Sequence, residues 1–248
     1  MFFPGANTEK NGKEICKNLF YFAENQMLDC NQYIIKDPST KELTLFDAGN
    51  GISLKSLFKG MEKCNLNPSN ITKVFLTHEH VDHVLGLYPL IKLRKNDSLE
   101  IFAYGETANI LSEGDETRIF PGNLGISARM FGVEIIPLKV IDLINSKEIL
   151  ISSEYQFQIH YTPGHSLGSI SYYDPEKRIL IPGDLVFTGG SFGRYDFPGG
   201  SLSTLINSIK KVNELDVKYL LPGHMGISDQ GNQQMALSYK MIQSINFY

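Results

Sequence analysis

Motifs of histidine and aspartate that each follow a short apolar segment constrain this chain more than any other feature. Five of its six histidines fall into three such motifs. The first reads Thr-His-Glu-His-Val-Asp-His over residues 77–83, directly after the apolar residues 74–76. Pro-Gly-His turns end at His165 and His224, and a Pro-Gly-Asp turn ends at Asp184. The fold must therefore place several strand ends where a rigid sheet can hold side chains in a cleft.

The motifs contain seven candidate metal ligands: His78, His80, Asp82, His83, His165, Asp184 and His224. Imidazole and carboxylate ligands without a thiolate suit zinc, iron(II) or manganese(II). Seven ligands are too many for one tetrahedral ion, but they fit two ions about 3.5–4 Å apart that share a carboxylate and a water. The sequence therefore predicts a two-metal site. His160 is excluded, because it lies in an alternating strand pattern at residues 155–161.

Length and charge limit the classes of partner. The 248 residues suffice for a large core and contain no linker, so we expect one domain over residues 1–248. A net charge of −4 without a basic stripe argues against nucleic acid. No apolar segment approaches a membrane span. Three cysteines without metal-type spacing, and an N-terminus without a secretory pattern, favour the cytoplasm. The oligomeric state is left open.

The order of predicted elements indicates two packed sheets with helices outside. In the first half, strands are predicted at residues 19–23, 31–36, 43–46, 73–76 and 99–103. A helix is predicted around residues 54–61, another follows the first motif, and residues 113–130 are expected to be a loop or a covering segment. In the second half, strands are predicted at residues 133–136, 156–161, 169–173, 178–181 and 218–221. Amphipathic stripes predict a helix beginning near Ser201 and a last helix around residues 235–245.

The motifs, in this order, resemble those of the metallo-β-lactamase-fold hydrolases over nearly the whole chain. The resemblance implies an α+β fold, a four-layer αββα sandwich of two mixed β-sheets flanked by helices. It implies a first metal site made of His78, His80 and His165. It implies a second site made of Asp82, His83 and His224. Asp184 would bridge the two ions, and Asp47, in the family's early Asp-x-Gly turn, would support the ligands from behind.

Residues 183–200 are similar to glyoxalase II, in particular to short prokaryotic members of this hydroxyacylglutathione hydrolase-like group. That group carries a Gly-Asp-x-x-Phe run followed by Gly-Arg or Gly-Lys. The similarity implies a small-molecule acyl substrate, with Arg194 and Tyr195 as substrate-binding residues. An ion pair between Arg194 and Asp196 is the structural alternative.

The resemblance implies a metal-dependent hydrolase that cleaves an ester or thioester, with a hydroxide bridging two divalent ions as the nucleophile. Zinc is the expected metal, and iron(II) and manganese(II) are the alternatives. Asp82 and Asp184 are the expected catalytic carboxylates. A lactonase on the same fold is an alternative, although lactonases usually have Tyr where Phe187 stands. A second alternative is a mononuclear-iron persulfide dioxygenase, which would use a subset of the ligands and consume oxygen.

Overall fold

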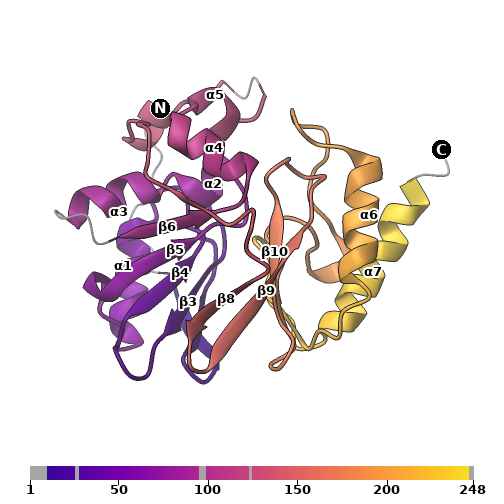
Figure 1. Ribbon diagram of the computed structural model, residues 1–248, viewed down its shortest axis with the longest axis horizontal. Helices are drawn as coiled ribbons and strands as arrows, with labels where there is room; N and C mark the ends of the chain where they lie inside the picture. The colour runs from indigo at the N-terminus through magenta and orange to yellow at the C-terminus, as the bar shows by residue number, and fades with distance from the viewer. Residues whose placement is uncertain (1–9, 26–27, 95–98, 123–124, 246–248) are drawn as a thin grey trace.

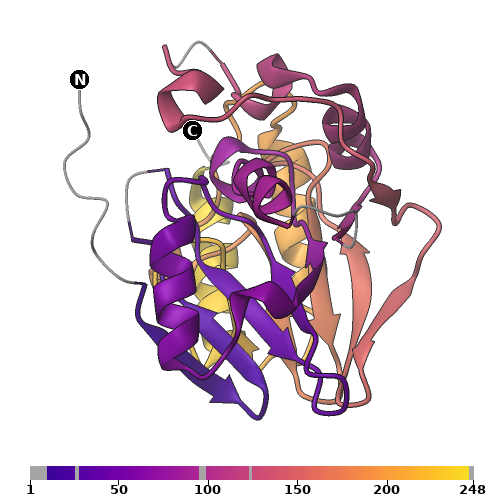
Figure 2. The ribbon, with the colours of Figure 1, turned by 90° about the vertical axis from the view of Figure 1, so that its left-hand side faces the viewer.

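Strands gathered into two sheets form the centre of the fold, and helices cover both outer faces (Figure 1). The computed structural model describes residues 10–25, 28–94, 99–122 and 125–245. Figure 2 shows helices of the N-terminal half in front of the first sheet. The layers are helix, sheet, sheet and helix, so the predicted four-layer αββα sandwich of the α+β class is confirmed.

Seven strands make up the first sheet and follow one another in sequence order. They are β1 (Gly12–Cys16), β2 (Leu19–Phe22), β3 (Gln32–Lys36), β4 (Leu43–Phe46), β5 (Ile71–Phe75), β6 (Glu100–Ala103) and β7 (Ile141–Asp142). Strands β1 to β4 pair antiparallel, whereas β4 to β7 pair parallel. Parallel neighbours need crossover connections, so the C-terminal ends of β4, β5 and β6 meet at one edge.

Helices fill these crossovers on the outer face of the first sheet. They are α1 (Leu54–Lys63), η1 (Pro68–Asn70), α2 (Val81–Val84), α3 (Leu87–Leu93), α4 (Glu106–Glu113), α5 (Glu116–Ile119) and η2 (Ala128–Phe131). Helix α1 confirms the helix predicted around residues 54–61. The helix predicted after the first motif is divided into α2 and α3. The chain turns between them at Gly86, where a Cβ atom would lie 1.9 Å from the Ala48 carbonyl oxygen.

The second sheet contains five strands in the order β12, β11, β10, β9, β8. Their bounds are β8 (Glu148–Ser152), β9 (Tyr155–Tyr161), β10 (Ile170–Asp174), β11 (Ile179–Ile181) and β12 (Tyr219–Leu220). Only β11 and β12 pair parallel, and the connection between them contains η3 (Thr188–Gly190) and α6 (Leu202–Val212). Helix α6 starts where predicted, because the Ser201 hydroxyl accepts a hydrogen bond from the Thr204 amide.

The last helix, α7 (Gly231–Ile245), packs beside α6 against the second sheet. The apolar stripe predicted around residues 235–245 therefore faces the core, where Met235 and Ile242 are buried. None of the described helices is long and apolar enough to cross a bilayer.

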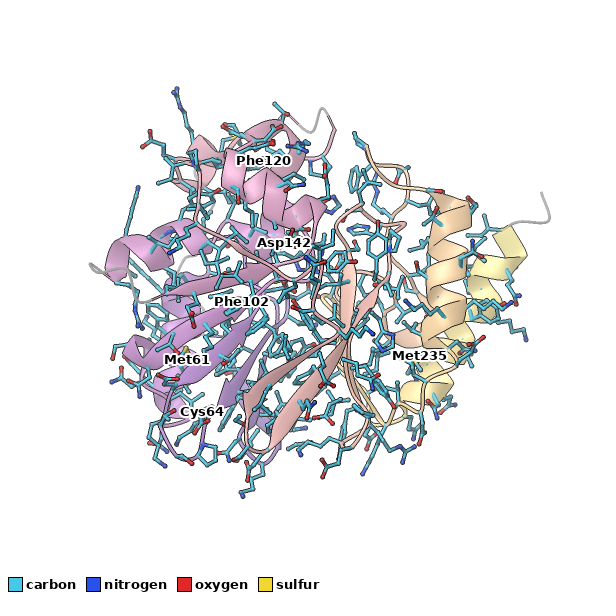
Figure 3. The ribbon with its side chains drawn as sticks, viewed as in Figure 1. Met61, Cys64, Phe102, Phe120, Asp142 and Met235 are labelled. Atoms are coloured by element: carbon cyan, nitrogen blue, oxygen red, sulfur yellow. The ribbon has the colours of Figure 1, made fainter. Side chains whose placement is uncertain are left out.

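Three hydrophobic layers hold the four structural layers together, and Figure 3 labels residues from all three. Met61 of α1 belongs to the layer between the helices and the first sheet. Phe102 packs at the layer between the sheets, where its ring stacks 4.3 Å from Phe75. Met235 of α7 belongs to the layer behind the second sheet. Burying aromatic rings between the sheets fixes the position of their edges relative to each other.

The strand predicted at residues 133–136 is wrong. These residues form no strand, because the segment runs along α4, where the Leu138 amide donates to the Leu111 carbonyl. Pro137 also lacks the amide hydrogen that a central strand would use. Residues 113–130, expected to form a loop or a covering segment, include α5 and part of η2. The short strands β1, β7 and β8 were not predicted from the sequence, and β7 has only two residues.

Candidate metal centre

Four connections place the seven candidate ligands at one edge of the two sheets. The first motif begins just after β5, and its last residues form the start of α2. His165 follows β9, Asp184 follows β11, and His224 follows β12. Because these strand ends face one another across the interface between the sheets, residues far apart in sequence converge there.

We call His78, His80 and His165 the first triad, because one ligand atom of each lies within 4.8 Å of the others. All three side chains are buried. His80 Nδ1 and His165 Nε2 face each other at 2.8 Å. Two imidazole lone pairs at this distance need a proton or a cation between them, so the arrangement fits a bound metal ion.

We call Asp82, His83 and His224 the second triad, whose ligand atoms also lie within 4.8 Å of one another. His224 Nε2 lies 3.1 Å from Asp82 Oδ2. His83 is fully buried, whereas the side chains of His224 and Asp82 are 22% and 13% exposed. The second triad is therefore the side of the cluster that solvent reaches.

Asp184 lies between the two triads. Its Oδ2 is 3.6 Å from His165 Nε2 of the first triad and 3.2 Å from His224 Nε2 of the second. Its Oδ1 is 3.3 Å from His83 Nε2. This is the position expected for a carboxylate shared by two ions. The closeness depends on Gly223, where a Cβ atom would lie 2.2 Å from Asp184 Oδ1.

Hydrogen bonds determine which nitrogen of each histidine is free to bind a metal. Asp47 accepts from the Thr77 hydroxyl at 2.9 Å and pairs with His83 Nδ1 at 2.9 Å. A carboxylate only accepts, so His83 carries its proton on Nδ1. The Thr77 hydroxyl has already donated its proton, so at 3.1 Å it accepts from His78 Nδ1. Both histidines therefore present an unprotonated Nε2 to the cluster.

His165 and His224 are oriented by hydrogen bonds in the same way. His165 Nδ1 donates to the Arg194 carbonyl oxygen at 2.6 Å, and His224 Nδ1 donates to Glu24 Oε2 at 2.7 Å. Their Nε2 atoms therefore also carry lone pairs. An outer partner that fixes the tautomer of an imidazole is typical of metal-ligating histidines.

Unpartnered polar atoms test whether these residues fit a metal. Among the described residues, the buried side-chain atoms without a hydrogen-bond partner include His78 Nε2, His83 Nε2 and Asp184 Oδ1. Buried polar groups are almost always paired, so three such atoms at one point fit the ligands of a cation. The donor set fits divalent ions that accept nitrogen and oxygen ligands.

The pKa values separate the triads. Burial lowers the pKa of His78 well below its usual range and that of His80 to about 3, so these imidazoles are neutral. Burial also opposes the charged form of His224, but Asp184 and Asp82 raise its pKa above the usual range. The same carboxylates favour a positive charge at this position, which a divalent ion would supply.

Asp47 lies behind His83, where the sequence analysis expected it. Its Oδ1 accepts from the Thr77 amide at 2.8 Å, in addition to the two bonds made by Oδ2. The residue has a positive φ of 56°, which Asp tolerates better than most residues. This conformation turns the carboxylate toward both the first motif and the sheet edge.

The two residues expected to bind substrate lie in different surroundings. The Arg194 guanidinium is exposed, forms two hydrogen bonds with Asp196, and lies 4.1 Å from the centre of the Phe197 ring. Tyr195 packs against the hydrophobic layer behind the second sheet. Phe197, not singled out in the sequence, is an aromatic residue beside the cluster, with its ring 5.7 Å from that of His80.

Two acidic residues near the ligands were also missed. Glu24 contacts His224, although 200 residues separate them. Glu79 is buried between the first two ligand histidines and accepts hydrogen bonds from Thr107 and Ser166. Glu79 could have been noticed as a charged residue inside the first motif, whereas nothing in the sequence connects Glu24 with His224.

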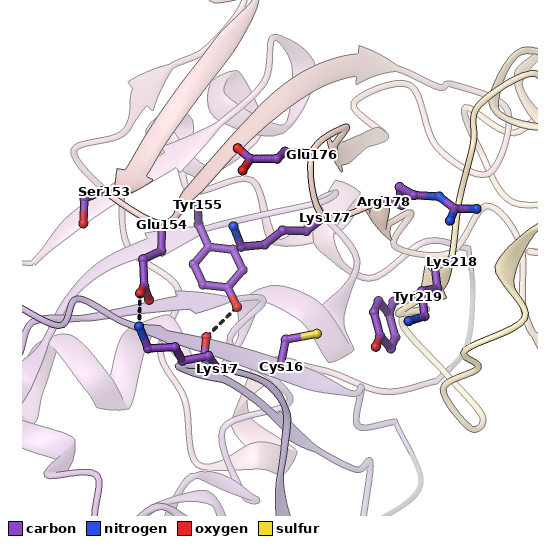
Figure 4. A pocket seen from close by; sticks show the side chains of 10 residues that line it. All are labelled: Cys16, Lys17, Ser153, Glu154, Tyr155, Glu176, Lys177, Arg178, Lys218 and Tyr219. Carbon is purple, nitrogen blue, oxygen red and sulfur yellow. Dashed lines mark hydrogen bonds and ion pairs between the residues drawn. The ribbon is translucent and has the colours of Figure 1, made fainter.

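A separate pocket of about 610 Å³ opens at the other end of the strands (Figure 4). It is lined by the turns that precede β2, β9 and β11 and by the start of β12. Its charges have both signs: Lys17 pairs with Glu154, and Lys177 lies 4.8 Å from the centre of the Tyr155 ring. None of the candidate ligands lines this pocket, so it is distinct from the metal centre.

Known proteins are similar to this chain in both fold and sequence. The family described as the metallo-beta-lactamase superfamily matches residues 26–224. Hydroxyacylglutathione hydrolase GloC of Haemophilus influenzae is 31% identical over 172 residues, which are 68% of this chain and 73% of that protein. The probable metallo-hydrolase MJ0888 of Methanocaldococcus jannaschii is 30% identical over 84% of this chain and 92% of its own.

A solved structure supports the same assignment. The crystal structure of TTHA1623 in a di-iron-bound form is 28% identical in sequence and has a TM-score of 0.63. The match covers 85% of this chain and 95% of that one. By sequence and by fold, the chain belongs to the metallo-beta-lactamase superfamily.

Proposed function

We propose that this hydrolase binds two divalent metal ions and cleaves a thioester or ester of a small acyl compound. The observation that carries the proposal is Asp184, whose two oxygens face ligands of both triads. The similarity to a hydroxyacylglutathione hydrolase supports an acyl substrate, and the di-iron form of TTHA1623 supports a pair of ions. We expect zinc, with iron(II) and manganese(II) as the alternatives.

When bound, two divalent ions would lower the pKa of a shared water toward neutrality and offset negative charge on a carbonyl oxygen. The first triad would hold one ion with neutral imidazoles, and the second triad would hold the other. Asp184 would keep them at a fixed separation. The chain's own contribution is thus a rigid set of ligand groups. The tautomers of four ligand histidines are fixed in advance by the carboxylates of Asp47 and Glu24, the Arg194 carbonyl and the Thr77 hydroxyl.

Asp82 is the carboxylate placed to handle a proton. Its side chain is partly exposed, and its Oδ2 lies 3.1 Å from His224 on the solvent side of the cluster. A thiolate leaving group needs little protonation, since a thiol has a pKa of about 8.5. An alkoxide needs a proton, which a carboxylate or water at this position could deliver. This difference favours thioesters over simple esters.

We propose that substrate enters beside Arg194 and Phe197. The guanidinium could pair with an anionic group of the substrate if it left Asp196, and the Phe197 ring offers an apolar surface next to His80. Tyr195 has a supporting role in this proposal, because its ring packs against the layer under α6.

The test compares three substrates with protein reconstituted with zinc and counted for metal: S-D-lactoylglutathione, a thioester without glutathione, and a lactone. Thioester hydrolysis with two ions per chain is the expected result, and Arg194→Gln should raise KM several-fold only for the anionic substrate. Preference for the lactone would assign the lactonase reaction. One iron per chain, with oxygen uptake on glutathione persulfide, would replace the proposal by the dioxygenase reaction.

A further inference from the structure

The loop that carries His224 is fastened to the first sheet, although His224 belongs to the end of the second. The Asn31 amide donates to the Gly223 carbonyl at 2.7 Å, and its side chain donates to the Pro222 carbonyl at 2.9 Å. The Tyr33 hydroxyl donates to the same Pro222 carbonyl at 2.7 Å. These contacts fix the backbone of residues 222–225, but none of them touches the imidazole.

Glu24, in the connection between β2 and β3, contacts the imidazole itself. Its Oε2 accepts from His224 Nδ1 at 2.7 Å, and its Oε1 accepts from the Met225 amide at 2.7 Å. The Glu24 amide in turn donates to the Asn31 side chain at 2.9 Å. Both carboxylate oxygens therefore accept a hydrogen bond, and the backbone of Glu24 is itself fixed by its hydrogen bond to Asn31.

This contact decides which nitrogen of His224 faces the cluster. Because a carboxylate can only accept, Nδ1 must carry a proton, and Nε2 is the nitrogen left to bind an ion beside Asp82 and Asp184. Nε2 is 3.1 Å from Asp82 Oδ2 and 3.2 Å from Asp184 Oδ2, where the second ion would lie. A rotated ring or the other tautomer would present an N–H or a carbon to that position.

The partner of His224 differs from those of the other ligands. His165 is fixed by a backbone carbonyl, and His83 by the buried Asp47. Glu24 is a side chain that is 34% exposed, as is expected at the open side of the cluster. Its support is therefore the one most readily changed without disturbing the core.

We propose that Glu24 is a positioning residue for the second metal ion: it fixes the orientation and tautomer of His224 and leaves the first triad unaffected. The proposal rests on the two-ion site of the proposed function. Outer-sphere partners of this kind typically change metal affinity by about 10–100-fold.

The experiment is a zinc titration of the metal-free full chain against a chromophoric chelator, for the wild type, Glu24→Gln and Glu24→Asp. Gln has the same size as Glu, but its NH2 group would face one of the two N–H donors from which Glu24 accepts hydrogen bonds. We expect Glu24→Gln to weaken the second ion by about 10–100-fold and leave the first unchanged. Glu24→Asp, which keeps both oxygens, should recover part of this loss.

Glu154→Gln is the matched control. Glu154 also accepts two hydrogen bonds from side chains and is partly exposed, but it lies in the pocket at the other end of the strands. It should bind both ions like the wild type. Thermal unfolding of the metal-free variants checks that the fold is retained.

Three results would overturn the proposal: native affinity for both ions in Glu24→Gln, an equal loss for both ions, or a wild-type chain that binds one ion only. The titration measures binding and not turnover. A chain that gives the expected titration but hydrolyses no thioester would leave the role of Glu24 standing and remove the proposed reaction.

Discussion

The first triad offers only imidazole nitrogens, whereas the second combines two imidazoles with the Asp82 carboxylate. Burial keeps His78 and His80 neutral by lowering their pKa. Despite burial, Cys30 and then the neighbouring carboxylates raise the pKa of His83, and neighbouring carboxylates raise that of His224. The first triad is closed to solvent, and the second is partly open. The first triad is therefore suited to coordinate an ion with neutral ligands, whereas the second carries charged ligands and is accessible to solvent.

The groups that orient the ligand histidines also differ between the two triads. His78 and His165 rely on Thr77 and on a backbone carbonyl, which are parts of the loops that carry them or lie close by. His224 relies on Glu24, which reaches it from the other sheet. The contact that orients His224 thus depends on how the two halves of the chain meet, whereas those of His78 and His165 lie within one half, and we expect the second triad to be the more easily disturbed of the two.

The largest effect is expected at Asp184, which serves both triads. Asp184→Asn replaces one shared oxygen by an NH2 group that cannot bind a cation, so the second ion should be lost and turnover should fall by more than about 100-fold, beyond the loss typical of outer partners. Metal counting and thioester hydrolysis measure both effects. Asp216→Asn, an exposed change at the far end of the strands, is the control. Full activity of Asp184→Asn would rule out the two-ion mechanism.

Asp47 should affect both triads, because it orients His83 directly and His78 through Thr77. Asp47→Asn leaves at least one of its three donors facing an NH2 group, and we expect both ions to weaken by about 10–100-fold. A zinc titration against a chelator measures this. Asp37→Asn, which alters a similar carboxylate in an exposed turn between β3 and β4, should leave both affinities unchanged. Loss of the second ion alone would mean that Thr77 orients His78 without help.

The difference in exposure predicts the order of metal release. A chelator should remove the ion of the second triad at least about tenfold faster than that of the first, a barrier difference of about 1.4 kcal/mol. Stopped-flow release from cobalt-substituted protein, followed by its visible spectrum, would resolve the two phases. A single phase that removes both ions together would show that the triads act as one unit and would contradict the contrast drawn between them.

Sequence reasoning was most successful where a ligand belongs to a local motif at the end of a strand. His165, Asp184 and His224 each follow a strand and a glycine turn, so their residue types and positions were visible in the sequence. Glu24 could not be found in this way, because its contact with His224 depends on how the two sheets are packed. The seven candidate ligands lie together in the structure, but their roles remain predictions.

Side-chain direction was the other weakness of the sequence analysis. Tyr195 and Phe197 both stand near Arg194 in the sequence, yet Tyr195 packs into the layer under α6 and Phe197 faces His80. Similarly, residues 133–136 are rich in β-branched residues, as strands are, but Pro137 and the contact of Leu138 with Leu111 hold this segment along a helix instead. Local patterns describe what a segment could bury, whereas its neighbours decide which partner it meets.

The smallest effect is expected at Glu79, an acidic residue beside the first triad, as Glu24 is an acidic residue beside the second. It lies between His78 and His80, and its Oε2 accepts hydrogen bonds from Thr107 at 2.8 Å and from Ser166, the neighbour of His165, at 2.9 Å. Unlike Glu24, it touches no ligand ring among its described contacts. Glu79→Gln keeps an oxygen for both hydroxyl donors, so only the charge is lost.

We therefore expect Glu79→Gln to change the free energy of unfolding of the metal-free protein by about 1 kcal/mol, measured by urea denaturation. The affinity of the first ion should stay within about threefold of the wild type, since outer partners that matter change it by about 10–100-fold. Glu154→Gln again provides the control. A loss of more than tenfold at the first triad would mean that its buried carboxylate tunes the metal as strongly as Glu24 tunes the second, and the distinction between the supports of the two triads would fail.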